Sequence, residues 1–592
     1  MLESGLLVAG PQGWHLDGPL PPFAIPATLQ DSLAARLDRL APVKEIAQIG
    51  AAIGREFSYP LLRAVAGRDE PALRAALAQL EEAELLFRSG MLPDARYTFK
   101  HALVQDTAYE TLLRSRRQIL HRQIAETLQH QFAATVTAEP ELVAHHLTHA
   151  GLDEPAIEWW GKAGNQAVRR LAFKEAAAHL GKAIELADKF PATAPSAATA
   201  SNRLHLQTSL ANALIWAKGH HAPETTTAFA RARELANQVE DASERFSVYW
   251  GLWVGHRNRC EPAPMREIAE LFLREATARP DCPETLIAHR NFGFTCWYFG
   301  DFAGAHQHFQ KTLELYDPAR HGDFANRFGN HPRPVTEIQD ALTVWVLGRV
   351  DEALCLVERA LADAKSATDA PTIGQAHLIA ALLGLVRCNR RAVATNSQAL
   401  AEIVSQYDLP VFWTGLAVFF QGWAKWLHAA EESGLAEMRR GLAIDREQGF
   451  VFLSPGFEAA LAEAEANAGE IVAGLRRLDD ALVELERTGH RYYEAEMHRI
   501  RAGILLKRDP ADTAAAEQSL QAAIGIAQSQ KARSFELRAA LSLARLYRAA
   551  NRDADAHAVL APAIESFPPT RQFPELTEAQ ALLEALSSRS LI

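Results

Sequence analysis

Cysteine is scarce in this sequence, which has five cysteines among 592 residues and no CxxC pair. A disulfide framework or a zinc site would need cysteines in closely spaced pairs. The scattered positions fit neither, so we expect reduced, buried thiols in a cytoplasmic protein. These cysteines are Cys260, Cys282, Cys296, Cys355 and Cys388.

Other absences narrow the class of protein. No apolar run approaches about 18 residues without a charge, so no membrane span is expected. The first residues lack the basic region that opens a signal peptide. An excess of positive charge is also missing, because the formal net charge is −11. This balance argues against general nucleic-acid binding.

Motifs for catalysis are missing as well. The sequence has no GxxxxGKS/T phosphate-binding loop and no HExxH, GxSxG or GxGxxG motif. A cyclase would need paired acidic residues that hold two metal ions on a βαββαβ fold, and no candidate region is present. We therefore expect no catalysis by this chain, no cofactor of its own and no metal site.

A spacing rule is what the sequence does contain. A small residue is followed four positions later by a bulky one, and three further on usually by another small one. These offsets place all three on one helical face, where small residues let a neighbouring helix approach closely. One such helix about every 40 residues predicts an α-solenoid of helix pairs. The ten sets are Ala176/Leu180/Ala183, Thr225/Phe229/Ala232, Ala269/Leu273/Ala276, Ala305/Phe309/Thr312, Ala353/Val357/Ala360, Ala392/Asn396/Ala399, Gly434/Met438/Gly441, Gly474/Leu478/Ala481, Ala516/Leu520/Ala523 and Ala556/Leu560/Ala563.

The rule is weakest at two sets, Ala392/Asn396/Ala399 and Gly434/Met438/Gly441. Asn396 is polar where a bulky apolar residue is expected, and the second set has glycine at both small positions. We expect looser packing and a bend at these places.

The region before the helical repeats, called the array below, has a different pattern of predicted elements. Residues 25–135 read as helix, helix, helix and then two short strands around the GMLPD turn, which is the order of a winged-helix domain. We expect a mainly α chain in four parts. Residues 1–24 are a linker or remnant of an upstream module, with a small hairpin. Residues 25–135 form the winged helix, 136–583 a TPR-like superhelix of about ten repeats, and 584–592 a frayed tail.

Several stretches resemble one family over residues 1–580. IPATLQDSLAARLDRLAPVKEIAQIGAAIGREFSYPLL and YTFKHALVQDTAYETLLRSRRQILHRQIAETL, followed by the array, are similar to the C-terminal region of bacterial STAND-type AAA ATPase and class III adenylate/guanylate cyclase multidomain proteins. The resemblance implies that His101 contacts the β-phosphate of ADP when an ATPase module is supplied. The cyclase and nucleotide-binding modules themselves are not in the chain, so Met1 would be either a truncated or misassigned start or the start of a genuine short protein.

Two groups are candidates for binding a partner or ligand. The irregular segment 317–334 gathers aromatic, basic and imidazole side chains, a composition typical of ligand sites on rigid scaffolds. An insertion between repeats without function is the alternative. Three tryptophans could line a concave groove or serve only as core. The residues are His321, Arg327, Phe328, His331 and Arg333 in the segment, and Trp413, Trp423 and Trp426 in the array.

Two further clusters could bind a metal ion or phosphates, but a structural role is favoured for each. His145 and His149 lie one helical turn apart, a spacing that can hold a metal, but no cysteine or carboxylate accompanies them and a helix face is favoured. The basic run LLRSRRQILHRQ could touch phosphates, yet a solvated helix face is the better reading in an acidic chain.

These observations predict a non-catalytic sensor and interaction region of a signal-transduction protein. A protein partner or small ligand would bind the concave face of the solenoid, with no nucleic acid and no membrane involved. The alternatives are a regulator acting in trans on a separate cyclase or ATPase, and a winged-helix transcriptional regulator.

Overall fold

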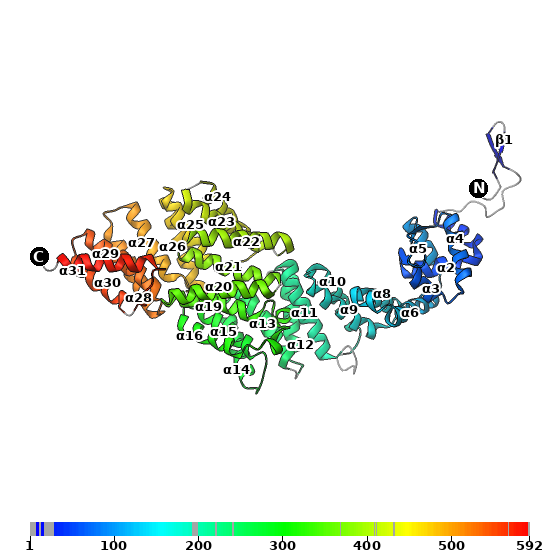
Figure 1. Ribbon diagram of the computed structural model, residues 1–592, viewed down its shortest axis with the longest axis horizontal. Helices are drawn as coiled ribbons and strands as arrows, with labels where there is room; N and C mark the ends of the chain where they lie inside the picture. Colours follow the sequence, from blue (N-terminus) through cyan, green and yellow to red (C-terminus); the bar gives the residue numbers. More distant parts are fainter. Residues whose placement is uncertain are drawn as a thin grey trace. The chain divides into compact units, whose positions relative to one another are not determined.

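The computed structural model describes residues 7–10, 13–16, 29–191, 199–219, 222–239, 242–367, 369–407, 409, 411–429, 432–565 and 567–589. The chain forms two compact units, shown in Figure 1. Unit 1 comprises residues 1–165 and 179–199, and unit 2 comprises residues 166–178 and 200–592. The contacts therefore group residues 136–165 with the N-terminal part rather than with the array.

Unit 1 begins with the expected hairpin. Strand β1 (Leu7–Gly10) pairs antiparallel with β2 (Gly13–Leu16), with Leu7 opposite Leu16. The rest of the predicted 1–24 segment lies outside the described residues.

A small α/β region follows the hairpin. Its sheet is antiparallel in the order β3-β5-β4, and Phe57 of β3 stacks on Tyr97 of β5 with ring centroids 5.9 Å apart. Ser58 and Asp69 cap the helices that follow them by accepting hydrogen bonds from Leu61 N and Ala72 N. The elements are α1 (Leu29–Arg39), α2 (Ala41–Ile53), β3 (Glu56–Ser58), α3 (Tyr59–Ala66), α4 (Glu70–Glu82), β4 (Leu86–Ser89), β5 (Arg96–Phe99) and α5 (Ala102–Glu110).

Helices continue from there to the C-terminal end. They are α6 (Arg114–Gln131), α7 (Ala133–Ala138), α8 (Pro140–Ala150), α9 (Asp153–Arg169), α10 (Phe173–Ala187), α11 (Ala200–Lys218), α12 (Pro223–Ala236), α13 (Ala242–Asn258), α14 (Pro262–Thr277), α15 (Thr285–Tyr298), α16 (Phe302–Leu315), α17 (Pro318–His321), α18 (Phe324–Phe328), α19 (Pro332–Val346), α20 (Val350–Ala367), α21 (Ala370–Val386), α22 (Arg390–Tyr407), α23 (Val411–Ala429), α24 (Glu432–Glu447), α25 (Ser454–Asn467), α26 (Ile471–Thr488), α27 (Glu494–Arg508), α28 (Thr513–Ser529), α29 (Arg533–Ala549), α30 (Asp553–Ile564) and α31 (Pro574–Arg589). In Figure 1 the helix pairs of unit 2 follow one another along the chain from α11 to α31. The predicted solenoid of helix pairs is confirmed. The predicted tail, 584–592, is helical through Arg589, and its last three residues lie outside the described part.

The spacing rule marks the second helix of each pair. The ten sets fall on α10, α12, α14, α16, α20, α22, α24, α26, α28 and α30 of the described chain. Some of the bulky members pack where the facing helix has no side chain: Phe229 lies on Gly251, and Phe309 lies on Gly293, where a Cβ would sit 2.9 Å from the ring. Small and bulky positions therefore interlock the pairs as the sequence predicted.

The expectation of looser packing at Gly434/Met438/Gly441 is wrong. Helices α23 and α24 cross backbone to backbone through four glycines, and a Cβ on Gly422 would lie 2.6 Å from the carbonyl oxygen of Gly434. A Cβ on Gly441 would lie 2.7 Å from the carbonyl oxygen of Gly415. Glycine removes the side chains that would keep the axes apart, so the pair becomes tighter rather than looser.

Unit 2 closes on itself, because early repeats bond directly to late ones. The Tyr298 hydroxyl donates to the Thr488 carbonyl, 190 residues away, at 3.4 Å. The Ser534 hydroxyl donates to the Trp345 carbonyl at 2.6 Å across 189 residues. Arg538 Nη1 donates to the Val386 carbonyl at 2.6 Å. These hydrogen bonds join successive turns of the superhelix and enclose the first helices of the pairs.

Two further expectations can be compared with the structure. No helix of the described residues has both the length and the apolarity needed to cross a membrane. The five thiols are unpaired, but Cys355 and Cys388 are exposed, so the prediction of burial is wrong for these two. Cys355 lies on α20, and Cys388 lies in the turn between α21 and α22, where its φ is 54°.

Candidate functional site: a central pocket in unit 2

The segment 317–334 folds into short helices α17 and α18 whose predicted ligand-binding side chains hold the segment in place. Arg327 Nη1 pairs with Glu284 at 2.8 Å, and Arg327 Nη2 donates to the Ser243 carbonyl at 3.0 Å. Phe328 is fully buried and meets the edge of Trp250 with ring centroids 6.1 Å apart. Both side chains are therefore engaged in contacts within the protein.

The imidazole and remaining arginine side chains of the segment behave similarly. His321 is buried, and its Nδ1 accepts from the Asp317 amide at 2.9 Å. His331 Nε2 lies 3.2 Å from the Tyr316 hydroxyl. Arg333 forms an ion pair with Glu337 at 3.3 Å. The backbone positions between them, Gly329 and Asn330, are the part of the segment that reaches a cavity.

Of the three tryptophans, Trp413 borders the same cavity as Gly329 and Asn330. It also stacks with Trp216 at a ring-centroid distance of 6.3 Å. Trp423 is buried in the core, and Trp426 packs against the core while partly exposed. The structure therefore brings part of the predicted segment and one predicted tryptophan together.

The cavity they share is called the central pocket here; its enclosed volume is about 90 Å³, and the empty space within and in front of it, open solvent included, is about 860 Å³. Its walls come from the first helices of successive pairs, α11, α13, α15, α19, α21 and α23, and from the segment before α25. Seven rings face it, and none of its lining residues is acidic. The lining residues are Ile215, Trp216, Trp250, Trp253, Val254, Arg257, Asn258, Arg290, Phe294, Gly329, Asn330, Val335, Gln339, Gln375, Leu378, Ile379, Trp413, Phe450, Phe452 and Leu453.

Two arginines provide the charge of the central pocket. Arg257 lies over Phe452, with its guanidinium carbon 4.9 Å from the ring centroid, and its Nε donates to Asn258 Oδ1 at 3.0 Å. Arg290 is 7% exposed and donates to Asn330 Oδ1 at 2.7 Å. Burial lowers the pKa of both guanidinium groups, and the charge of Arg257 lowers that of Arg290 further. Among the described residues neither arginine has a carboxylate partner.

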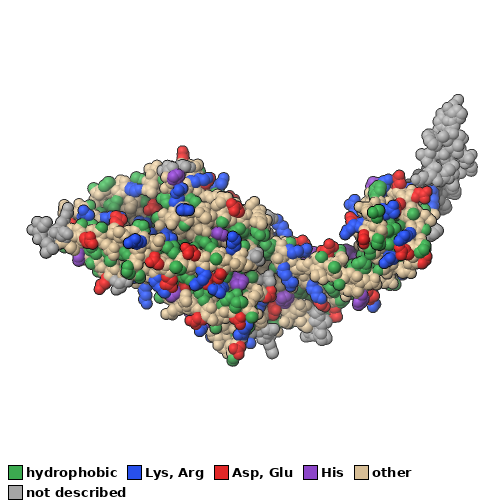
Figure 2. All heavy atoms as spheres, in the orientation of Figure 1, with side chains coloured by type: hydrophobic (Ala, Val, Ile, Leu, Met, Phe, Trp, Pro, Cys, Tyr) green, Lys and Arg blue, Asp and Glu red, His purple; other side chains and the backbone are tan. Residues whose placement is uncertain are grey.

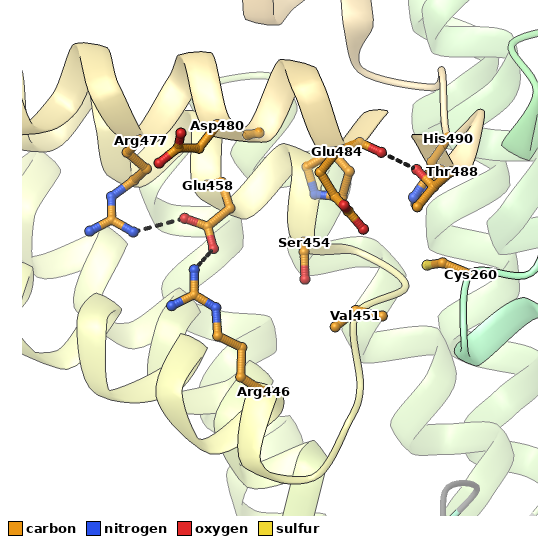
Figure 3. Close-up of a pocket in the computed structure, with 12 residues that line it drawn as sticks. Cys260, Arg446, Val451, Ser454, Glu458, Arg477, Asp480, Glu484, Thr488 and His490 are labelled. Carbon is orange, nitrogen blue, oxygen red and sulfur yellow. Dashed lines mark hydrogen bonds and ion pairs between the residues drawn. The ribbon is translucent and has the colours of Figure 1, made fainter. Parts of the chain in front are cut away.

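A second cavity, shown in Figure 3, differs from the central pocket in that its arginines are paired with a glutamate. It lies against α25 and α26, with Cys260 on the far wall, and has an enclosed volume of about 240 Å³. Arg446 and Arg477 both point to Glu458, the latter at 2.8 Å. Because its positive charges are already neutralised, this cavity offers little attraction to an anion.

Sequence inspection missed Arg257 and Arg290, although a signal was present. The tripeptide His-Arg-Asn occurs at 256–258 on α13 and again at 289–291 on α15. The two arginines lie at different positions of two neighbouring first helices, Arg257 in the last turn of α13 and Arg290 in the first half of α15. Only the fold shows that both reach one cavity and that no acidic side chain meets them there.

The candidate residues of unit 1 are arranged differently. His101 is exposed at the N-terminus of α5. His145 and His149 lie near His121 and His146, whose Nδ1 atoms are 2.8 Å apart. Within the described ranges no cluster of histidine, cysteine or acidic side chains has the arrangement of a metal site. The basic run is engaged in part, since Arg116 pairs with Glu45 at 3.2 Å.

On the visible face of unit 2, Figure 2 shows acidic and basic side chains interspersed rather than gathered by sign. No broad charged surface on that face competes with the central pocket as a binding site for a charged partner.

No family model matches the chain. An uncharacterized protein of Rhizobium meliloti (strain 1021) is 28% identical over 530 residues, which cover 88% of this chain and 50% of that protein. The chain thus spans about half the length of this curated relative.

Solved structures with similar helices are remote. A Rap protein in complex with competence and sporulation factor is 12% identical with a TM-score of 0.41, covering 66% of this chain and 98% of that one. A STAND protein with a tetratricopeptide repeat sensor from Pyrococcus horikoshii is 13% identical with a TM-score of 0.28, covering 95% of this chain and 68% of that one. At these values function has to be argued from the chain's own residues.

Proposed function

We propose that this chain is a sensor and interaction region of a signal-transduction protein, and that unit 2 receives the signal by binding a ligand in the central pocket. One observation carries the proposal. A cavity lined by seven rings and two unpaired guanidinium groups lies where the first helices of several repeats meet. A ligand there would contact six helices at once and would therefore stabilise one arrangement of the superhelix over others.

The proposed role of unit 1 is to pass the signal on. Its order of helices and antiparallel strands supports a winged helix, and His101 stands exposed at the start of α5. The resemblance to STAND ATPases and cyclases suggests that unit 1 passes the state of unit 2 to an ATPase or cyclase module. We propose the same His101 contact with an ADP phosphate when that module is present in the same chain or supplied in trans.

A thermal-shift screen of the purified chain tests the sensor function. We expect at least one compound of a small-molecule library, neutral or charged, to raise the melting temperature. The shift should disappear in Gln375→Trp, which fills the pocket, and persist in Arg446→Gln, which alters the second cavity. If no compound stabilises the wild type, or if Gln375→Trp retains every shift, the central pocket is not a sensor site.

A further inference from the structure

The two arginines of the central pocket come from two neighbouring first helices of unit 2. Arg257 and Arg290 are the middle residues of the repeated His-Arg-Asn tripeptide on α13 and α15. Each is fixed by an amide oxygen, Asn258 Oδ1 for the first and Asn330 Oδ1 for the second. Amide partners orient a guanidinium group without neutralising it.

Burying two like charges near each other without an anion is costly. Elsewhere in unit 2, three buried or half-buried arginines avoid this cost by pairing with a glutamate. Arg327 pairs with Glu284 at 2.8 Å, Arg477 with Glu465 at 2.8 Å, and Arg538 with Glu575 at 2.6 Å. The central pocket departs from the pattern of its own fold, so its missing negative charge has to come from outside the chain.

The donors that remain fit an oxyanion. Beyond Nε of Arg257 and Nη1 of Arg290, the guanidinium nitrogens make no hydrogen bond to any described residue. Asn258 Nδ2 is buried without a partner and its residue lines the pocket, so it is a further donor for an oxyanion. Carboxylate and phosphate oxygens accept forked hydrogen bonds from guanidinium groups, often two at a time.

The remaining walls are aromatic. Arg257 lies over the rings of Trp253, Phe294 and Phe452. Trp216 and Trp413 stack against each other and both border the cavity. Flat apolar walls of this kind bury a planar ring by stacking, while the polar groups fix its orientation.

We propose that the central pocket binds an oxyanion, carboxylate or phosphate, of a molecule that also contains a planar ring, with Arg257 and Arg290 clamping the acid group. This assignment rests on the proposed sensor function and names the chemical class of its ligand. The two sources of the oxyanion, an aromatic acid and a nucleotide, are separated by the choice of probes.

Fluorescence and calorimetric titrations of the full chain test the clamp. The probes are 2-naphthoate and adenosine monophosphate, each paired with a neutral counterpart, 2-naphthamide and adenosine. We expect one acid to bind at least about tenfold more tightly than its neutral counterpart, the equivalent of about 1.4 kcal/mol. Arg290→Gln and Arg257→Gln should remove that preference, while Arg446→Gln should keep it.

The melting temperature of the ligand-free protein gives an independent test of the clamp. Because Arg290 carries a buried charge without a carboxylate partner, Arg290→Gln should raise the melting temperature of the free protein. Arg477→Gln, which breaks two ion pairs with buried glutamates, should lower it. A substitution that merely damages folding would lower both, so the sign of the Arg290→Gln shift separates a binding role from a structural one.

The outcomes are distinct from those of the sensor screen. If neutral rings bind as tightly as their acids, or if Arg290→Gln retains the acid preference, the clamp is refuted although the pocket still binds ligands. If neither acid binds, the assigned ligand class is refuted, while stabilisers found in the library would keep the sensor function. A lower melting temperature for ligand-free Arg290→Gln would also overturn the clamp.

Discussion

The glycine crossing of α23 and α24 supports a quantitative prediction, because it positions Trp413 at the central pocket. We consider Gly422→Ala. Its Cβ would lie 2.6 Å from the carbonyl oxygen of Gly434 and 2.7 Å from the amide nitrogen of Met438. Both are backbone atoms, which cannot move aside as a flexible side chain can, so α24 itself has to shift.

The magnitude follows from two opposing effects. Replacing a glycine inside a helix with alanine gains about 1 kcal/mol of helix propensity. Forcing a methyl group into a packed interface costs about 1–3 kcal/mol, with the upper end expected where backbone is met. Gly525→Ala on α28 is the matched control, because a Cβ there meets no atom within 4 Å. Gly422→Ala should therefore lose about 1–2 kcal/mol, and Gly525→Ala should gain up to about 1 kcal/mol.

Urea unfolding followed by circular dichroism measures both changes. Hydrogen exchange then locates the loss, which should concentrate in α23 and α24. The reasoning is refuted if Gly422→Ala is as stable as the wild type, or if it and Gly525→Ala change stability in the same direction.

Three further predictions concern buried ionisable groups. Burial and neighbouring imidazoles lower the pKa of His121 to about 3 and that of His146 well below its usual value. The unfolded chain takes up protons near pH 6.5 that the folded chain does not, so stability falls as the pH is lowered from 7 to 5. Each of the two histidines contributes about 2 kcal/mol, so hydrogen exchange in α6 and α8 should show a loss of about 4 kcal/mol, of which about half should remain in His121→Gln. Burial raises the pKa of Asp445 to about 8. Stability held by the protonated form is lost as pH rises from 4 to 8, and Asp445→Asn should stabilise the protein more at pH 8 than at pH 5 in urea titrations; an equal gain at both would contradict this. Arg327→Met leaves buried Glu284 without its cation and should cost about 3–5 kcal/mol, partly recovered by adding Glu284→Gln; no recovery would assign the loss to packing alone.

Much of the fold could be read from the sequence because its determinants are local. The small-bulky-small sets identify the second helix of each pair, since the side chains that decide the packing lie within two turns of one another. The hairpin and the strands around 86–99 were visible from turn residues and alternation. The glycines of α24 were misread because the same pattern suits loose and close packing, and only the facing glycines of α23 distinguish the two.

The candidate site was harder to predict, because its groups come from helices far apart in the chain. The sequence supplied the segment 317–334 and Trp413, and the structure places Gly329, Asn330 and Trp413 at the cavity. From the sequence alone one could not know that Arg327 pairs with Glu284 whereas Arg290 has no carboxylate partner in the part of the chain that the structure describes. Charge pairing depends on which side chains the superhelix brings together.

Composition and periodicity by themselves determined a helical repeat protein without recognisable catalytic motifs, because burial patterns and short-range spacing are written along the chain. The tertiary structure alone decided where the chain can bind. Bonds between residues nearly 190 positions apart close the superhelix and enclose the first helices. That closure leaves two guanidinium groups among aromatic rings without an acidic side chain, an arrangement that no local stretch of sequence specifies.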